Sequence, residues 1–275
     1  MPSLKTFALL NTVIFALGTL NYTIYTYSPF YVLPLYALKN LLLPHILEYA
    51  SRHDPLVTKP SFDTFCIRYV IQSTLIDFLT IAALHQFART AESAIWTYVL
   101  FIPISFVYEL VFDLFHYATH RAIHQNPRLY VWIHKTHHQS RNVNAFTTLV
   151  QSPLDLLITN IIPLCLTTLL IPTSSLFLHI YMYYKTLVEM GGHIGRFSKT
   201  PCFPQCVWIP LGINIALFAH DHACHHMYPH TNYSKRFALW DKLFGTYRDI
   251  KNIKQYIADA APTERFESMS SFAGI

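Results

Sequence analysis

The chain has 275 residues, of which 52% are hydrophobic and only 13% are charged, and its mean hydropathy is +0.28. Soluble domains average about 25% charged residues, so this composition argues against an ordinary soluble enzyme and predicts a membrane-embedded protein. The sequence lacks the apolar–polar alternation of a transmembrane β-barrel, and we therefore expect an all-α fold. The net charge of +5 is small, and the basic residues gather near histidine-rich segments, which favours positive-inside topology over nucleic-acid binding.

Apolar segments predict about four transmembrane helices in the first part of the chain. The candidates are residues 6–27, 30–47, 64–86 and 94–115, and each is close to the roughly 20 residues that cross a bilayer. The second contains Pro34 and Pro44, so it is either a span or a kinked interfacial segment. The third contains Arg68 and Asp77, and in hydrocarbon such charges must pair or face the protein interior.

The character of the chain changes after Phe115. Residues 116–146 are rich in His, Arg and Asn, whereas residues 153–190 turn apolar again. Pro163 and Pro172 divide this apolar stretch and predict a transmembrane or re-entrant hairpin. We therefore expect three regions: a transmembrane anchor (1–115), a histidine-rich helical cap that forms the catalytic region (116–260) and a loose tail (261–275).

Three histidine clusters are the main candidates for chemistry. They are His120 and His124, then His134, His137 and His138, then His222, His225 and His226, and His116 extends the first. Residues three or four apart share a helix face, so we expect each cluster to converge on one point. Neutral imidazole suits iron, zinc and copper, and eight ligands exceed the four of a structural zinc site. The clusters thus predict two metal ions, whereas the scattered His45, His53, His85 and His179 are interpreted as ordinary core or surface residues.

The order of these motifs resembles a known family. The chain reads His120-Arg-x-x-His124, His134-Lys-x-His137-His138, Gly-His193-x-Gly and His222-x-x-His225-His226. This order is similar to that of the fatty acid hydroxylase superfamily, membrane non-haem di-iron enzymes that include sterol C-5 desaturase and C-4 methylsterol oxidase. The later Asn232-Tyr233-Ser234 and the stretch 239–246 resemble its sterol desaturase branch. The resemblance covers roughly residues 100–248.

The resemblance implies a four-helix membrane anchor and a cytosolic cap that encloses two irons, in the endoplasmic reticulum membrane. It also implies dioxygen as the oxidant, electrons from NAD(P)H through cytochrome b5 and its reductase, and a lipophilic substrate that is hydroxylated or desaturated. A sterol is the first expectation, and a terpenoid or polyketide is an alternative. The metal ligands that it implies are His120, His124, His134, His137, His138, His193, His222, His225 and His226.

Two departures from the family pattern bear on the supporting residues of the site. Ser152-Pro153, followed by Asp155, replaces a His-Pro pair, and Ala223 replaces an acid. Asp221 is a candidate to orient a ligand imidazole, as carboxylates commonly do, and Asp113 is expected to be a supporting residue. His220 and His230 remain candidates for extra ligands or proton carriers.

Two other functions stay open from the sequence. The same histidines would also suit zinc in a redox-neutral hydrolase or isomerase acting on a lipophilic substrate. A non-catalytic metal-binding membrane protein or a metal transporter is the third hypothesis. A transporter would place its ligands within the spans, whereas these histidines follow them.

Overall fold

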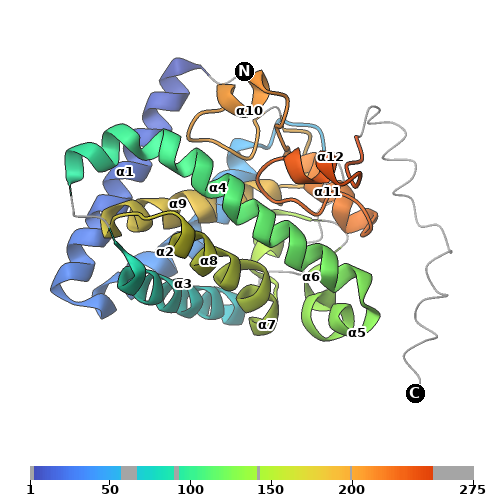
Figure 1. Ribbon diagram of the computed structural model, residues 1–275, viewed down its shortest axis with the longest axis horizontal. Coiled ribbons are helices and arrows are strands. Elements are labelled where there is room, and N and C mark those ends of the chain that lie inside the picture. The colour runs from blue at the N-terminus through green and yellow to red at the C-terminus, as the bar shows by residue number, and fades with distance from the viewer. Residues whose placement is uncertain (1–2, 57–66, 90–92, 141–142, 199, 250–275) are drawn as a thin grey trace.

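The computed structural model describes residues 3–56, 67–89, 93–140, 143–198 and 200–249 (Figure 1). Over these residues the chain forms helices and no strands, apart from the isolated β-bridges Leu56–Arg196 and Ala216–Phe237. The predicted all-α fold is therefore confirmed. The tail expected at 261–275 lies outside the described residues.

The long helices are α1 (Leu4–Tyr27), α2 (Leu33–Ala50), α3 (Ile67–Phe87), α4 (Ala94–Gln125) and α9 (Ser175–Gly192). The short elements are η1 (Pro29–Val32), α5 (Pro127–Leu129), η3 (Tyr130–His134), α6 (Lys135–His138), η4 (Ala145–Leu149), α7 (Pro153–Asp155), η5 (Leu156–Ile161), α8 (Ile162–Leu170), α10 (Trp208–Gly212), α11 (Ala219–Met227) and α12 (Leu239–Leu243). Serine caps start two of the long helices, because the side chains of Ser3 and Ser174 accept backbone N–H bonds in the first turns of α1 and α9.

Among the described residues, five helical stretches are long and apolar enough to cross a membrane: α1, η1–α2, α3, α4 and Pro153–Leu170. The chain is therefore a multi-pass membrane protein. The fifth stretch is the first half of the apolar hairpin expected at 153–190. Helix α4 continues through the first histidine cluster to Gln125, so its last turns carry His120 and His124 beyond the apolar segment.

Helix α9 lies at the centre of the bundle. It contacts α1, α2, α3 and α4, and Figure 1 shows it crossing among them. Its side chains from Ser175 to Thr186 are buried on all faces, which is how an apolar helix inside a bundle behaves. Helix α9 belongs to the region 116–260, and its buried side chains form one hydrophobic core with those of the N-terminal helices.

The buried charge in α3 is neutralised inside the bundle, as its position in an apolar segment required. The Asp77 carboxylate lies 2.9 Å from the Lys39 ammonium of α2. Lys39 also donates to the Thr186 hydroxyl of α9 at 2.7 Å, and Asn40 donates to Asp77 at 3.1 Å. These contacts join α2, α3 and α9. Removing one partner would leave an uncompensated buried charge, so the contacts hold the three helices together.

Gly18 allows α1 to approach α9 closely. A Cβ atom at this position would lie 2.5 Å from the Ile180 Cα, a backbone atom that moves only with its helix. We expect Gly18→Ala to lower the unfolding temperature of the detergent-solubilised protein, because overpacking typically costs about 1–3 kcal/mol. Gly212→Ala is the matched control, since its added Cβ has no atom of the described residues within 4 Å. Equal unfolding temperatures for the two variants would contradict this packing.

Candidate metal centre

The structure brings nine buried histidines into two groups. In each group one ring nitrogen from every member lies within 4.8 Å of the others. The first group is His120, His124, His134, His138 and His225. The second group is His137, His193, His222 and His226. These are the nine residues that the family resemblance implies as ligands, and their assignment as ligands remains a prediction.

Helical spacing explains how the clusters are divided. Residues four apart stay together, so His120 and His124 of α4 enter the first group and His222 and His226 of α11 enter the second. The remaining histidine of each three-membered cluster belongs to the opposite group. His137 lies in the second group, apart from His134 and His138, and His225 lies in the first, apart from its neighbours on α11. The expected convergence holds for His120 and His124 but was wrong for the second and third clusters, because neighbouring helix positions point in different directions.

The Nε2 atoms are directed at one another within each group. In the first group, Nε2 of His120 lies 3.0 Å from that of His134 and 3.2 Å from that of His124. In the second, Nε2 of His193 lies 3.2 Å from that of His137 and 2.9 Å from that of His222. Two nitrogens at this separation attract each other only if a proton or a cation lies between them.

The opposite ring nitrogens decide between these two possibilities. Nδ1 of His120 lies 2.8 Å from the Tyr233 carbonyl oxygen, and Nδ1 of His225 lies 2.7 Å from that of Thr231. Nδ1 of His193 lies 2.8 Å from the Glu189 carbonyl oxygen. A carbonyl oxygen only accepts, so Nδ1 carries the proton in each neutral ring. Each Nε2 therefore presents a lone pair to the centre of its group, as a metal ligand does.

Burial keeps these rings neutral. It lowers the pKa of His193 to about 4 and that of His225 to about 3, and it lowers the pKa of His222 well below its ordinary value. Since Nδ1 of His193 and of His225 carries the single proton of each neutral ring, their Nε2 atoms are unprotonated at neutral pH. Nε2 of His226 is buried with no hydrogen-bond partner among the described residues. The donor set thus fits a transition-metal cation in each group, and both groups consist of imidazole donors without a thiolate or a carboxylate.

The two groups lie side by side. The ring of His138 in the first group stacks on that of His226 in the second, with centroids 4.6 Å apart. His137 and His138 are neighbours in the chain but belong to different groups. Two metal ions bound here would share one dry pocket at the end of the apolar bundle.

Asp155 is a supporting carboxylate that the sequence pattern alone does not reveal. Its Oδ2 accepts a hydrogen bond from Nδ1 of His134 at 2.8 Å, and its side chain is fully buried. Ser152 positions it by accepting the Asp155 N–H at 3.1 Å. The replacement of the family His-Pro pair at this point was the available signal. A carboxylate on the outer nitrogen orients a metal-binding imidazole and makes it more basic.

The segment 231–241 contains the backbone carbonyl groups of Thr231 and Tyr233, which accept hydrogen bonds from His225 and His120. Buried carboxylates fix the backbone next to them. Asp241 of α12 accepts the backbone N–H groups of Tyr233 and Ser234, each at 2.8 Å. Asp113 of α4 accepts the next three backbone N–H groups, from Lys235, Arg236 and Phe237, at 2.7–3.0 Å. Asp113 is therefore a supporting residue, as expected. The segment 232–246, which resembles the sterol desaturase branch, thus contains both these backbone N–H groups and Asp241.

Four other sequence candidates lie outside both groups. Asp221 does not orient a ligand imidazole; it accepts the Phe218 N–H at 2.9 Å and so caps α11. Nδ1 of His116 lies 2.7 Å from the Thr159 carbonyl oxygen. His220 stacks between Phe197 and Phe218, and His230 is exposed. Neither flanking histidine joins a group of possible ligands.

Comparison with known protein families shows which family this chain belongs to. The sequence model described as fatty acid hydroxylase matches residues 105–246, more than half of the chain, and this stretch contains all nine histidines. The chain belongs to the fatty acid hydroxylase family. The predicted resemblance is therefore confirmed.

Curated relatives of this fatty acid hydroxylase family member are similar over the same region. A fatty acid hydroxylase from Lecanicillium sp. is 31% identical over 52% of this chain and 41% of its own length. Sphinganine C4-monooxygenase 1 from Arabidopsis thaliana is 27% identical over 58% of this chain and 60% of its length. A methylsterol monooxygenase from Aspergillus fumigatus is 28% identical over 56% and 49%. The chain thus spans about half the length of these relatives, and no solved structure matches it.

We expect single ligand variants to lose metal group by group. His225→Ala removes a donor from the first group and His137→Ala removes one from the second, so each purified variant should bind about one metal ion fewer than the wild type. Metal content by mass spectrometry measures this directly. His45→Ala is the control, because His45 lies outside both groups and should leave the metal content unchanged. Full metal loading in either ligand variant would refute the assignment.

Asp155→Asn tests the supporting carboxylate. Loss of the negative charge should weaken metal binding at the first group about 10–100-fold, the usual effect of such partners, and leave the second group intact. Competition with a chelator measures the two affinities. Asp249→Asn, at an exposed position, is the control. An unchanged affinity in Asp155→Asn would show that this carboxylate does not act on the metal.

Proposed function

We propose that this chain is a membrane-bound non-haem di-iron oxygenase that hydroxylates or desaturates a lipophilic substrate with dioxygen. Membership of a family whose curated relatives are lipid and sterol oxygenases supports an oxidoreductase. The observation that carries the proposal is the convergence of nine buried imidazoles, each offering one ring nitrogen, in two adjacent groups. The proposed ligands of both irons are those nine histidines.

The donor set of the first group favours iron over zinc. Structural zinc is almost always four-coordinate, and catalytic zinc usually has three protein ligands, whereas the first group supplies five nitrogens. Imidazole is a suitable ligand for iron. Two irons held here would supply activation of dioxygen and removal of hydrogen from an unactivated C–H bond, chemistry that protein side chains do not perform.

The protein residues supply position and a dry environment. Hydrogen bonds from Nδ1 to the carbonyl oxygens of Tyr233, Thr231 and Glu189 hold three ligand rings in one orientation. Burial of all nine rings excludes bulk water, which protects reactive species from side reactions. The position of His120 and His124 just beyond the apolar part of α4 supports a pocket close to the hydrocarbon region, where a lipophilic substrate dissolves.

Location and electron supply complete the proposal. We propose an endoplasmic reticulum membrane location, with the histidine-rich cap on the cytosolic side, and electrons from NAD(P)H through cytochrome b5 and its reductase. Exposed Arg128, Lys135, Lys242 and Arg248 support a cytosolic cap, because basic residues favour that side. A basic surface also speeds association with an acidic electron-transfer protein.

The test is reductant-dependent oxygen uptake by the iron-loaded protein in nanodiscs with NADH, cytochrome b5 and its reductase. We expect about two irons per chain and oxygen consumption that rises when a lipid extract is added. Product mass then separates hydroxylation, a gain of one oxygen atom, from desaturation, a loss of two hydrogens. Bound zinc after expression in iron-rich medium, with no oxygen uptake, would contradict the proposal and favour a redox-neutral enzyme.

A further inference from the structure

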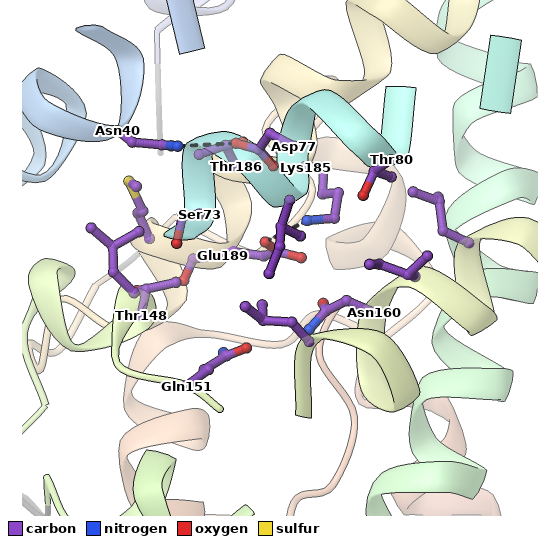
Figure 2. Close-up of a pocket in the computed structure, with 16 residues that line it drawn as sticks. Asn40, Ser73, Asp77, Thr80, Thr148, Gln151, Asn160, Lys185, Thr186 and Glu189 are labelled. Carbon is purple, nitrogen blue, oxygen red and sulfur yellow. Dashed lines mark hydrogen bonds and ion pairs between the residues drawn. The ribbon is translucent and has the colours of Figure 1, made fainter. Parts of the chain in front are cut away.

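A polar cleft lies next to the second histidine group, between helices that cross the membrane. Its walls come from α3, from η5 and α8, from α9 and from the segment around η4. Figure 2 shows the labelled polar side chains arranged around one space. Those used here are Asp77, Gln151, Asn160, Lys185 and Glu189. Because α3 and Pro153–Leu170 are both candidate spans, a lipid can reach this cleft within the bilayer.

The charged groups of the cleft are already neutralised by protein partners. Asp77 pairs with Lys39. Glu189 pairs with Lys185 at 2.8 Å, with Lys235 at 3.2 Å and with Arg236 at 3.3 Å. The lining itself contains two carboxylates and one ammonium. An amine end group would therefore find both carboxylates of the lining already occupied by protein cations.

Gln151 supplies a polar atom of this lining that lacks a protein partner. The residue is 5% exposed, and its Oε1 is buried with no hydrogen-bond partner among the described residues. An unsatisfied buried acceptor costs about 1–3 kcal/mol, so the cleft favours an occupant that donates a hydrogen bond. A hydroxyl also accepts, and it would suit either orientation of the Gln151 amide.

The cleft adjoins the metal-binding residues through the backbone. Glu189 lines the cleft, and its carbonyl oxygen receives Nδ1 of His193. Gln151 follows Val150, whose carbonyl oxygen lies 3.4 Å from Nδ1 of His137. Both histidines belong to the second group. A molecule bound to Gln151 would thus lie close to the second group, because the preceding residue, Val150, contacts the His137 ring of that group.

We propose that this cleft binds the end group of the lipid substrate, and that this end group is uncharged and donates a hydrogen bond to Gln151. A lipid alcohol is the simplest member of this class, and a lipid amide shares its chemistry. An ionised fatty acid is not the preferred ligand, because a carboxylate only accepts hydrogen bonds and cannot donate one to the Gln151 Oε1. The inference rests on the proposed function, because it identifies the substrate of that same site.

Binding without turnover tests this inference apart from the oxygen chemistry. Iron-loaded protein in nanodiscs, with no reductant, is incubated with tritiated 1-octadecanol. Unlabelled 1-octadecanol, its methyl ether and stearate then compete for the site. We expect the alcohol to compete about tenfold better than the ether, which lacks the donor, and better than stearate. Gln151→Met should remove this preference, whereas Gln86→Met, at an exposed position of α3, should retain it.

Controls keep the outcomes separate. Unchanged iron content in Gln151→Met shows that the histidine groups remain intact, and Gln151→Asn, which withdraws the amide, replaces that variant if it misfolds. Equal competition by alcohol and ether in the wild type, or an unchanged preference in the variant, would overturn the cleft assignment even if oxygen uptake is observed. Preferential alcohol binding without any oxygen uptake would instead overturn the proposed function and leave the cleft as a lipid-alcohol site.

Discussion

The structure depends on hydrogen bonds from the outer nitrogens of buried imidazoles to backbone carbonyl oxygens. These bonds fix the proton on Nδ1, so that Nε2 is left as a lone-pair donor directed at the centre of each group. Without a cation, several such donors about 3 Å apart would repel one another in a dry pocket. The fold therefore has to hold the carbonyl groups rigidly, and several of its polar contacts serve that purpose.

The loop at 231–237 shows how this rigidity is achieved. Its carbonyl groups receive His120 and His225, while its N–H groups are held by two buried carboxylates, Asp113 and Asp241. Arg236, within this loop, is fully buried and contacts Glu109 and Glu189. Helix α9 has two roles. It forms the centre of the bundle, and in its last turn the Glu189 carbonyl oxygen accepts a hydrogen bond from His193.

Much of this arrangement is predictable from local sequence. Histidines four residues apart had to share a helix face, and the apolar stretches had to span the membrane. The division of neighbouring histidines between two groups was not predictable, because it depends on how α4, α6 and α11 are placed around the pocket. Asp155 was missed for a similar reason: it lies 21 residues from His134 in the chain, and only the fold brings them together. The backbone carbonyl groups that accept hydrogen bonds from the histidines were not predictable either, because any residue type can supply a backbone carbonyl.

The central claim is that both metal ions are bound by imidazole nitrogens alone among protein side chains. X-ray absorption at the iron edge of the iron-loaded protein tests this most directly. The account predicts a shell of nitrogen or oxygen scatterers at about 2.0–2.2 Å, with the multiple-scattering pattern of coordinated imidazole. A sulfur shell near about 2.3 Å, which would require a cysteine such as Cys224 as a ligand, or a spectrum without the imidazole pattern, would contradict it.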